Sequence, residues 1–394
     1  IVDRFNEAVG AEHNIWVDYN AMGDVDKRMI IATAGGDPPD VAGLADRFIT
    51  QYSDQDALLP LDDLTHEYGI DLDAFKPVWL KLCRSDGTLY ALPSTPFTVA
   101  LYYNRELFRQ AGLDPDHPPQ TTAELNEYAL KLTRRAPDEK GRDKIVQLGF
   151  TVSPRMLGWW HWLWPYFFDG QFWDGEQFTL DTPATHAAMN WIKQRRDALG
   201  NKDVLQFEAT ATIIESAQNP FLAGNLAMVF QGPWMSNWAR VYTPDLDYGV
   251  APFPSVTRER QNVFASCDVF VIPRGARHPR EAMIFLQYVM QQDVLEALCM
   301  EHGKVSPFRT PGENFFRDHP NPHIRVFDEM ASSPYAFGFP QMPSWVQASD
   351  ELLHMLDNVL RGAADPDEAI RATQEKVSAA VKTYEEMSAK RHGG

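Results

Sequence analysis

The chain has 394 residues, enough for two domains that each bury a core of their own. Its apolar content of 44% and charged content of 23% are those of an ordinary globular protein, and no run approaches the roughly 18 apolar residues of a membrane span. The net charge of −18 argues against nucleic acid or an anionic membrane surface as a partner.

The three cysteines, Cys83, Cys267 and Cys299, are far apart and odd in number, so they cannot form a complete disulfide framework. No zinc-type spacing is present, and we expect buried structural thiols, no metal and no cofactor. The chain begins at Ile1 in a helical pattern, without an initiator Met or signal peptide. We therefore expect that a leader was removed or that the numbering starts inside the mature protein.

In the first half of the chain, hydrophobic periodicity and turn residues predict alternating strands and helices. Asn14–Val17 is predicted to be a strand and Asp24–Thr33 a helix. Asp37–Gly43 is then predicted to be a turn that feeds a short strand, and Asp46 and Arg47 follow directly where a loop would leave that strand. Thr121 begins a capping-box pattern, because Glu124 follows three residues later.

In the second half, Pro183–Leu199 is predicted to be a helix that ends at Gly200. Leu226–Phe230 is a short apolar run typical of a strand buried on both faces. Gln231-Gly-Pro stops that strand, and Trp234 follows where ligands sit in open α/β sheets. A single tryptophan there is more often core packing than a ligand contact. A final helix is predicted from Pro366 to Ala389.

Strand and helix patterns alternate throughout, which favours an α/β fold. Proline-bearing joints near 93–96, 252–254 and 307–311 suit a pair of discontinuous domains that the chain enters more than once.

The usual catalytic signatures are absent from the sequence: there is no GxSxG, P-loop, GxGxxG or HExxH motif. The most unusual segment is Trp159–Trp173, which is rich in aromatic residues and interrupted by Pro165 and Gly170. Indole rings can cover the apolar faces of sugars while charged and amide groups bind the hydroxyls. Core packing and a ligand site remain equally good readings of this segment from composition alone.

Several ordered motifs resemble the extracellular (periplasmic) solute-binding proteins of ABC importers, in the sugar-binding, maltose-binding-protein-like branch. The motifs are Gly36-Asp-Pro-Pro-Asp-Val41, Asp46-Arg-Phe48, Tyr103-Asn-Arg-Glu-Leu-Phe108, Ala111-Gly-Leu113, Phe221-Leu-Ala-Gly-Asn-Leu-Ala-Met228, Gln231-Gly-Pro-Trp234, Tyr248-Gly-Val-Ala-Pro-Phe-Pro254 and Pro340-Gln-Met-Pro-Ser-Trp345.

The resemblance implies two discontinuous α/β lobes joined by a hinge, of the type II periplasmic-binding-protein class, with the ligand in the cleft between them. We expect residues 1–98 plus 268–308 in the N-terminal lobe and 99–267 plus 309–394 in the C-terminal lobe. The first strand of the family would precede Ile1.

The resemblance also implies ligand contacts. Asp46 and Arg47 would bind hydroxyls, and Trp234 and Trp345 would stack on sugar faces. Trp159, Trp160, His161 and Phe337 are expected to line the same cleft. The sequence departs from the maltose pattern at Trp159 and His161, at Phe97 and near Leu44, so the sugar need not be maltose.

The expected function is therefore binding of a mono- or oligosaccharide by hinge closure, without catalysis, and delivery to an ABC permease. The protein would be a monomer, periplasmic or extracellular, and lipid-anchored or free. Two alternatives stay open. The same fold would hold a polyamine or a sugar phosphate, with a cation held by the Trp-rich box and Asp46, or the chain would be a carbohydrate-active hydrolase or lyase.

Overall fold

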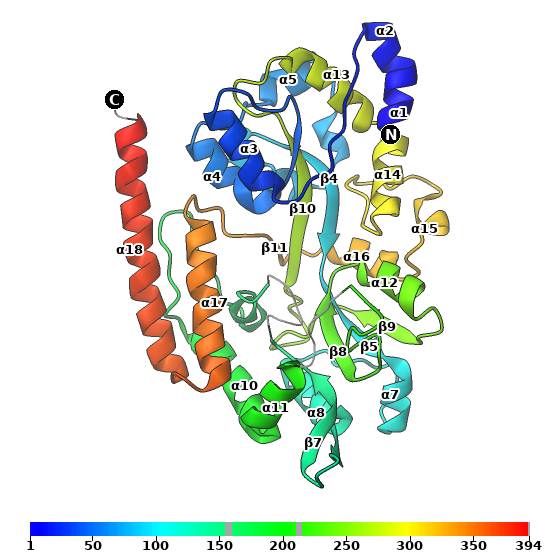
Figure 1. Cartoon of the computed structure of the whole chain (residues 1–394), viewed down its shortest axis with the longest axis vertical. Coiled ribbons are helices and arrows are strands. Elements are labelled where there is room, and N and C mark those ends of the chain that lie inside the picture. The colour runs from blue at the N-terminus through cyan, green and yellow to red at the C-terminus, as the bar shows by residue number, and fades with distance from the viewer. Residues whose placement is uncertain (154–159, 210–214, 393–394) are drawn as a thin grey trace.

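The computed structural model describes residues 1–153, 160–209 and 215–392. It is a mixed α/β protein with two lobes, as predicted (Figure 1). The upper lobe in Figure 1 contains α3, α4, α5 and α13, and the lower lobe contains β5, β7, β8 and β9. The long strands β4 and β10 run between the two lobes.

The helices of the first half of the chain are α1 (Val2–Phe5), α2 (Ala11–His13), α3 (Val25–Ala34), α4 (Ile49–Asp54), α5 (Asp62–Glu67), α6 (Pro77–Leu82), α7 (Arg105–Gln110), α8 (Thr122–Leu132) and α10 (Pro183–Leu199). Those of the second half are α11 (Asn201–Ala209), α12 (Met235–Tyr242), α13 (Pro279–Val289), α14 (Gln292–Glu301), α15 (Phe315–Asp318), α16 (Ile324–Met330), α17 (Trp345–Arg361) and α18 (Pro366–His392). Short 3-10 and π turns lie at η1 (Asn6–Gly10), η2 (Asp46–Phe48), η3 (Leu72–Ala74) and η4 (Trp164–Phe168).

The strands are β1 (Ala42–Ala45), β2 (Arg84–Ser85), β3 (Thr88–Leu89), β4 (Leu92–Thr98), β5 (Ala100–Asn104), β6 (Arg134–Pro137), β7 (Asp143–Phe150), β8 (Leu226–Gln231), β9 (Tyr248–Ala251), β10 (Val263–Val271) and β11 (Ala336–Phe337). In the described residues, the upper lobe is built on β1, β10 and β4, and the lower lobe on the order β6-β7-β8-β5-β9.

The strand β10 organises the region between the lobes. It pairs antiparallel with β1 on one side and with β4 on the other, and its first residues pair parallel with β11. The predicted lobe boundary between residues 267 and 268 falls inside this one continuous strand. The exact boundaries of the lobes stay a prediction.

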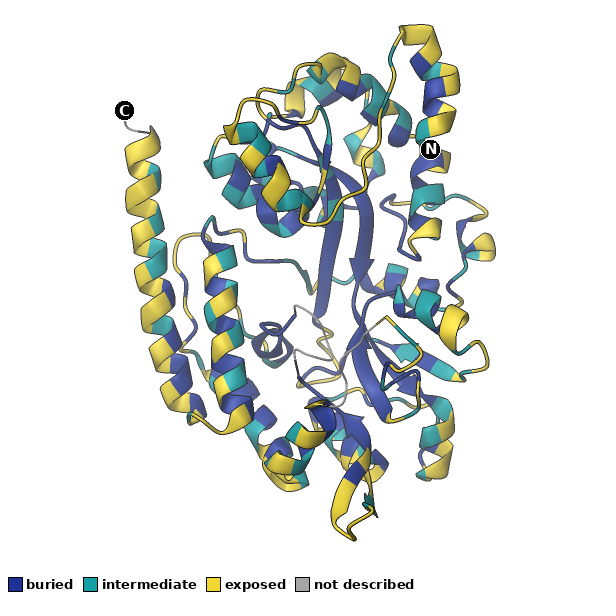
Figure 2. Cartoon of the chain, viewed as in Figure 1, coloured by how far each residue is buried: buried dark blue, intermediate teal, exposed yellow. Residues whose placement is uncertain are grey.

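The apolar core follows these sheets. Figure 2 shows β4, β10, β5 and β8 as buried, whereas the helices α17 and α18 alternate between buried and exposed positions. Every residue of β8 is buried, as its uncharged sequence predicts. All three cysteines are buried and free, which confirms the structural-thiol prediction.

Several sequence-predicted elements are confirmed, including the helix Pro183–Leu199 and the Thr121–Glu124 capping box. The strand predicted at Asn14–Val17 is wrong, because those residues form no strand. The side chain of Asn6 donates to the Val17 carbonyl oxygen at 2.9 Å and accepts from the Val17 amide at 2.8 Å. Both backbone groups that a neighbouring strand would use at Val17 are therefore occupied.

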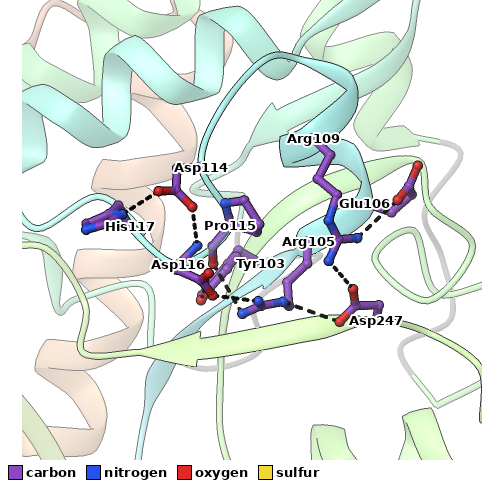
Figure 3. Close-up of polar contacts among 9 residues, drawn as sticks. All are labelled: Tyr103, Arg105, Glu106, Arg109, Asp114, Pro115, Asp116, His117 and Asp247. Carbon is purple, nitrogen blue, oxygen red and sulfur yellow. Dashed lines mark hydrogen bonds and ion pairs between the residues drawn. The ribbon is translucent and has the colours of Figure 1, made fainter.

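A polar network fixes the outer end of the lower lobe (Figure 3). Arg105 forms ion pairs with Asp116 at 2.6 Å and with Asp247 at 3.4 Å, and Arg109 pairs with Asp247 at 2.7 Å. Tyr103 donates to the Pro115 carbonyl oxygen at 3.1 Å. The network joins α7, the loop after it and the residue that precedes β9, and so it holds the edge of the sheet.

Candidate functional site

The turn after β1 places a buried carboxylate beside β10. Asp46 is 6% exposed, and its Oδ1 atom accepts a hydrogen bond from the Ser266 hydroxyl at 2.8 Å. Its Oδ2 atom is also buried and has no hydrogen-bond partner. Burial raises the pKa of Asp46 to about 7, although the bond from Ser266 and the charge of Arg47 oppose this shift. A buried acceptor without a donor is costly, and a ligand hydroxyl would satisfy it.

The residues next to Asp46 lead directly to Trp234. Ser266 of β10 pairs with Phe97 of β4, and the ring of Phe97 lies edge-on to that of Trp234, with 4.9 Å between centroids. Trp234 follows the Gly232-Pro233 stop after β8, as the sequence predicts, and is the N-cap residue that directly precedes α12. The structure therefore brings Asp46 of the upper lobe and Trp234 of the lower lobe to the same neighbourhood.

Trp160 extends this neighbourhood. Its ring lies 5.8 Å from that of Trp234, tilted by 33°, and its side chain is 1% exposed. Trp234 itself is half-buried and therefore retains surface that a ligand can contact. Gly232 is required here, because a Cβ atom on it would lie 2.3 Å from the Trp234 ring.

A lysine borders the same aromatic group. The Lys304 ammonium lies 5.0 Å from the Phe97 centroid and 5.9 Å from the Trp234 centroid. It also forms an ion pair with Asp268 and donates to Thr95 Oγ1 at 3.1 Å. Thr95 donates in turn to Asp268 at 2.9 Å. A charged, hydrogen-bonded side chain is thus held over the rings of Phe97 and Trp234.

Trp345 and Phe337 belong to a second, adjoining aromatic group around Trp162. Trp345 begins α17 and is 1% exposed, with its ring 4.9 Å from Trp162. Phe337 stacks on Tyr166 at 4.3 Å with an interplanar angle of 12°. The Trp345 side chain is therefore packed almost entirely against protein, whereas Phe337 is only partly buried.

The remaining predicted contacts are placed as follows. His161 is 7% exposed and donates from Nε2 to the Ser349 carbonyl oxygen of α17 at 2.8 Å. Burial lowers the pKa of His161, although the hydrogen bond to Ser349 and the charge of Asp350 oppose this shift. The guanidinium of Arg47 lies 4.6 Å from the ring centre of Phe48. Trp159 lies outside the described residues. The ligand role of each predicted residue stays a prediction.

Ser266 and Lys304 adjoin this site without having been predicted from the sequence, whereas Trp162 falls in the aromatic segment Trp159–Trp173. Ser266 lies inside a strand and Lys304 follows a helix end, and neither position carries a local motif. Their proximity to Asp46 and Trp234 arises from long-range pairing, which a single sequence does not reveal. Phe97 was noticed only as a departure from the family pattern, yet its ring joins the two lobes.

No group of three or more His, Cys, Asp or Glu side chains in the described parts of the chain could hold a metal ion. Within residues 1–153, 160–209 and 215–392, no helix combines the length and apolar character needed to cross a membrane. A cavity of about 220 Å³ beside α10 and α17 is lined by Lys193, Arg196, Asp197, Asn201, Val359, Gly362, Ala364 and Asp365 and includes none of the predicted ligand residues.

Known proteins with similar sequences or structures share this architecture. The maltotriose-binding protein of Pyrococcus abyssi (strain GE5 / Orsay) is 22% identical over 382 residues, which cover 95% of this chain and 75% of that protein. A structure of CpMnBP1 with mannotriose bound has a TM-score of 0.80 at 22% identity, covering 96% of this chain and 94% of the other. UgpB from Mycobacterium tuberculosis in complex with glycerophosphocholine has a TM-score of 0.77 at 20% identity, covering 97% of this chain and 94% of the other.

These likenesses show the shared two-lobed fold. The model of the family described as bacterial extracellular solute-binding protein matches residues 1–294, which is most of the chain. The protein therefore belongs to the family of bacterial extracellular solute-binding proteins.

Proposed function

We propose that the protein binds a carbohydrate between its two lobes and delivers it, chemically unchanged, to the permease of an ABC importer. The observation that carries this proposal is the buried Oδ2 atom of Asp46, which lacks a donor and lies one strand pair away from the half-buried ring of Trp234. A sugar offers both partners at once, since its hydroxyls donate to a carboxylate and its C–H face packs on an indole.

Hinge closure supplies the mechanism. Asp46 follows β1 of the upper lobe, and Trp234 follows β8 of the lower lobe. A ligand that contacts both is bound more tightly in the closed state than in the open one, so it shifts the population towards closure.

Family membership and the ligands of two relatives support a sugar as the solute. Two of the three relatives named above bind maltotriose and mannotriose, and the third, UgpB, is in complex with glycerophosphocholine. The family consists of solute-binding proteins, which supports binding without turnover. In the proposed role the protein acts outside the cytoplasmic membrane as a monomer, with or without a lipid anchor.

A ligand screen tests the proposal. Thermal unfolding is followed with mono- and oligosaccharides, including mannotriose and maltotriose, and in parallel with spermidine and glycerophosphocholine. At least one sugar should raise the midpoint of unfolding and be recovered intact by chromatography. Conversion of the sugar would instead indicate an enzyme. Stabilisation by spermidine or glycerophosphocholine and by no sugar would replace the carbohydrate with a cationic or phosphate-bearing solute.

A further inference from the structure

The C-terminal helix α18 contacts both lobes. Its first half packs in the lower lobe, where Ile370 and Val377 are completely buried. Gln374 donates from Nε2 to the Phe178 carbonyl oxygen at 3.1 Å, and Lys376 pairs with Glu351 of α17 at 3.1 Å. These contacts make the first half of α18 part of the lower lobe.

The last turns of α18 reach the upper lobe. Asp54, the final residue of α4, accepts hydrogen bonds from Tyr384 Oη at 2.7 Å, Ser388 Oγ at 2.9 Å and Arg391 Nη2 at 3.0 Å. The Arg391 guanidinium also lies 5.6 Å from the centre of the Tyr384 ring. Figure 1 shows α18 along the outer edge of the molecule, extending upward past α17 to the level of the upper lobe.

The three donors of α18 stabilise the Asp54 carboxylate as a group. A carboxylate at the carboxyl end of a helix is destabilised by the partial negative charge of the helix dipole there. Each hydrogen bond that α18 donates therefore stabilises the Asp54 carboxylate. The three donors lie on one face of α18 at positions i, i+4 and i+7, and they leave Asp54 together if the lobes separate. The Asp54 side chain is 22% exposed and that of Arg391 40% exposed, so the contact is accessible to water and readily broken.

We propose that Asp54, Tyr384, Ser388 and Arg391 form a latch that holds the two lobes closed. The latch contains none of the predicted ligand residues. It acts on the hinge equilibrium from outside the ligand site, by stabilising the closed state with or without solute. Because it depends only on the two-lobed fold, it does not rest on the identity of the ligand.

The test measures the distance between the lobes in the ligand-free protein. Spin labels are attached at Ala34→Cys on α3 and Gln194→Cys on α10, two exposed positions on different lobes. The native thiols at Cys83, Cys267 and Cys299 are buried, so they do not compete for the label. Pulsed electron paramagnetic resonance then reports the distribution of distances.

Asp54→Ala and, separately, Tyr384→Phe with Ser388→Ala should both move the population towards longer distances. The control Glu386→Ala, an exposed position on the same turn of α18, should leave the distribution unchanged. Hydrogen exchange of α18 is measured on the same variants. If the end of α18 frays in the variants while the distance between the labels stays at the wild-type value, the latch proposal is overturned. An unchanged distribution without fraying overturns it as well.

Discussion

Asp46 and Trp234 lie on different lobes, and they are linked through Ser266 and Phe97. Asp46 accepts a hydrogen bond from Ser266 at 2.8 Å, Ser266 pairs with Phe97 across β10 and β4, and the Phe97 ring lies 4.9 Å from that of Trp234. A change in the angle between the lobes therefore changes the distance and orientation between the buried Asp46 carboxylate and the Trp234 ring. We propose that this arrangement couples ligand binding to closure of the lobes.

Replacing Trp234 with alanine removes the proposed stacking surface. The affinity for the stabilising sugar should fall roughly 10- to 100-fold, because an indole contributes both apolar burial and a specific ring contact. Trp238→Ala, one helical turn further along α12, is the matched control and should bind almost normally. Isothermal titration calorimetry measures both variants, and circular dichroism verifies that they fold. Equal affinities for wild type and Trp234→Ala would assign this ring to packing.

The raised pKa of Asp46 predicts a pH-dependent cost of folding. Below pH 4 the folded and unfolded states both hold the proton, and Asp46 contributes no penalty. Between pH 4 and pH 7 the unfolded chain releases the proton first, because the pKa of Asp46 in the folded protein is about 7 instead of 3.8. Stability therefore falls across this window, by up to roughly 4 kcal/mol.

The variant Asp46→Asn cannot titrate and should lack this fall. Urea unfolding at pH 4 and at pH 7 should show the variant gaining stability relative to wild type as the pH rises. Asp203→Asn, at a partly exposed carboxylate of α11, provides the comparison for general charge effects. Parallel stability curves for wild type and Asp46→Asn would show that Asp46 ionises normally in the folded protein.

A buried ion pair in the lower lobe should be needed for stability. Arg196 donates from Nη1 to both carboxylate oxygens of Glu208, at 2.9 and 3.1 Å, and the two side chains are 6% and 4% exposed. Glu208→Gln leaves a buried guanidinium without its counter-charge and should cost roughly 3 kcal/mol. Asp197→Asn breaks the exposed pair with Lys193 and should cost less than about 1 kcal/mol. Similar losses in urea unfolding for the two variants would contradict the importance of burial.

The sequence predicts much of the fold because local signals and tertiary packing agree along most of the chain. The capping box at Thr121, the helix from Pro183 to Leu199 and the buried strand at Leu226 all form where their patterns indicate. The strand expected at Asn14–Val17 fails because a side chain, Asn6, takes the backbone groups of Val17. That competition comes from elsewhere in the chain and is invisible in the alternation of apolar residues.

The candidate site was predictable only in part, for a similar reason. Asp46 and Trp234 stand directly after strands, and their positions follow from local turn chemistry and family resemblance. Lys304 and Ser266 reach the same neighbourhood through the pairing of β10 with β4 and through the packing of α14 on β4. Trp160 and Trp345, which were expected to line the cleft, are almost fully buried because they pack against the rings of Trp234 and Trp162.

Calorimetric titration of the wild-type protein with mannotriose and maltotriose at pH 7, repeated in two buffers of different ionisation enthalpy, measures whether a sugar binds and whether Asp46 changes its protonation. A sugar hydroxyl that donates to Asp46 favours the charged carboxylate, so binding should be one-to-one and should release protons. The Asp46→Asn variant should release none. Absence of heat with both trisaccharides and every other sugar of the screen, or sugar binding without proton release, would contradict the account.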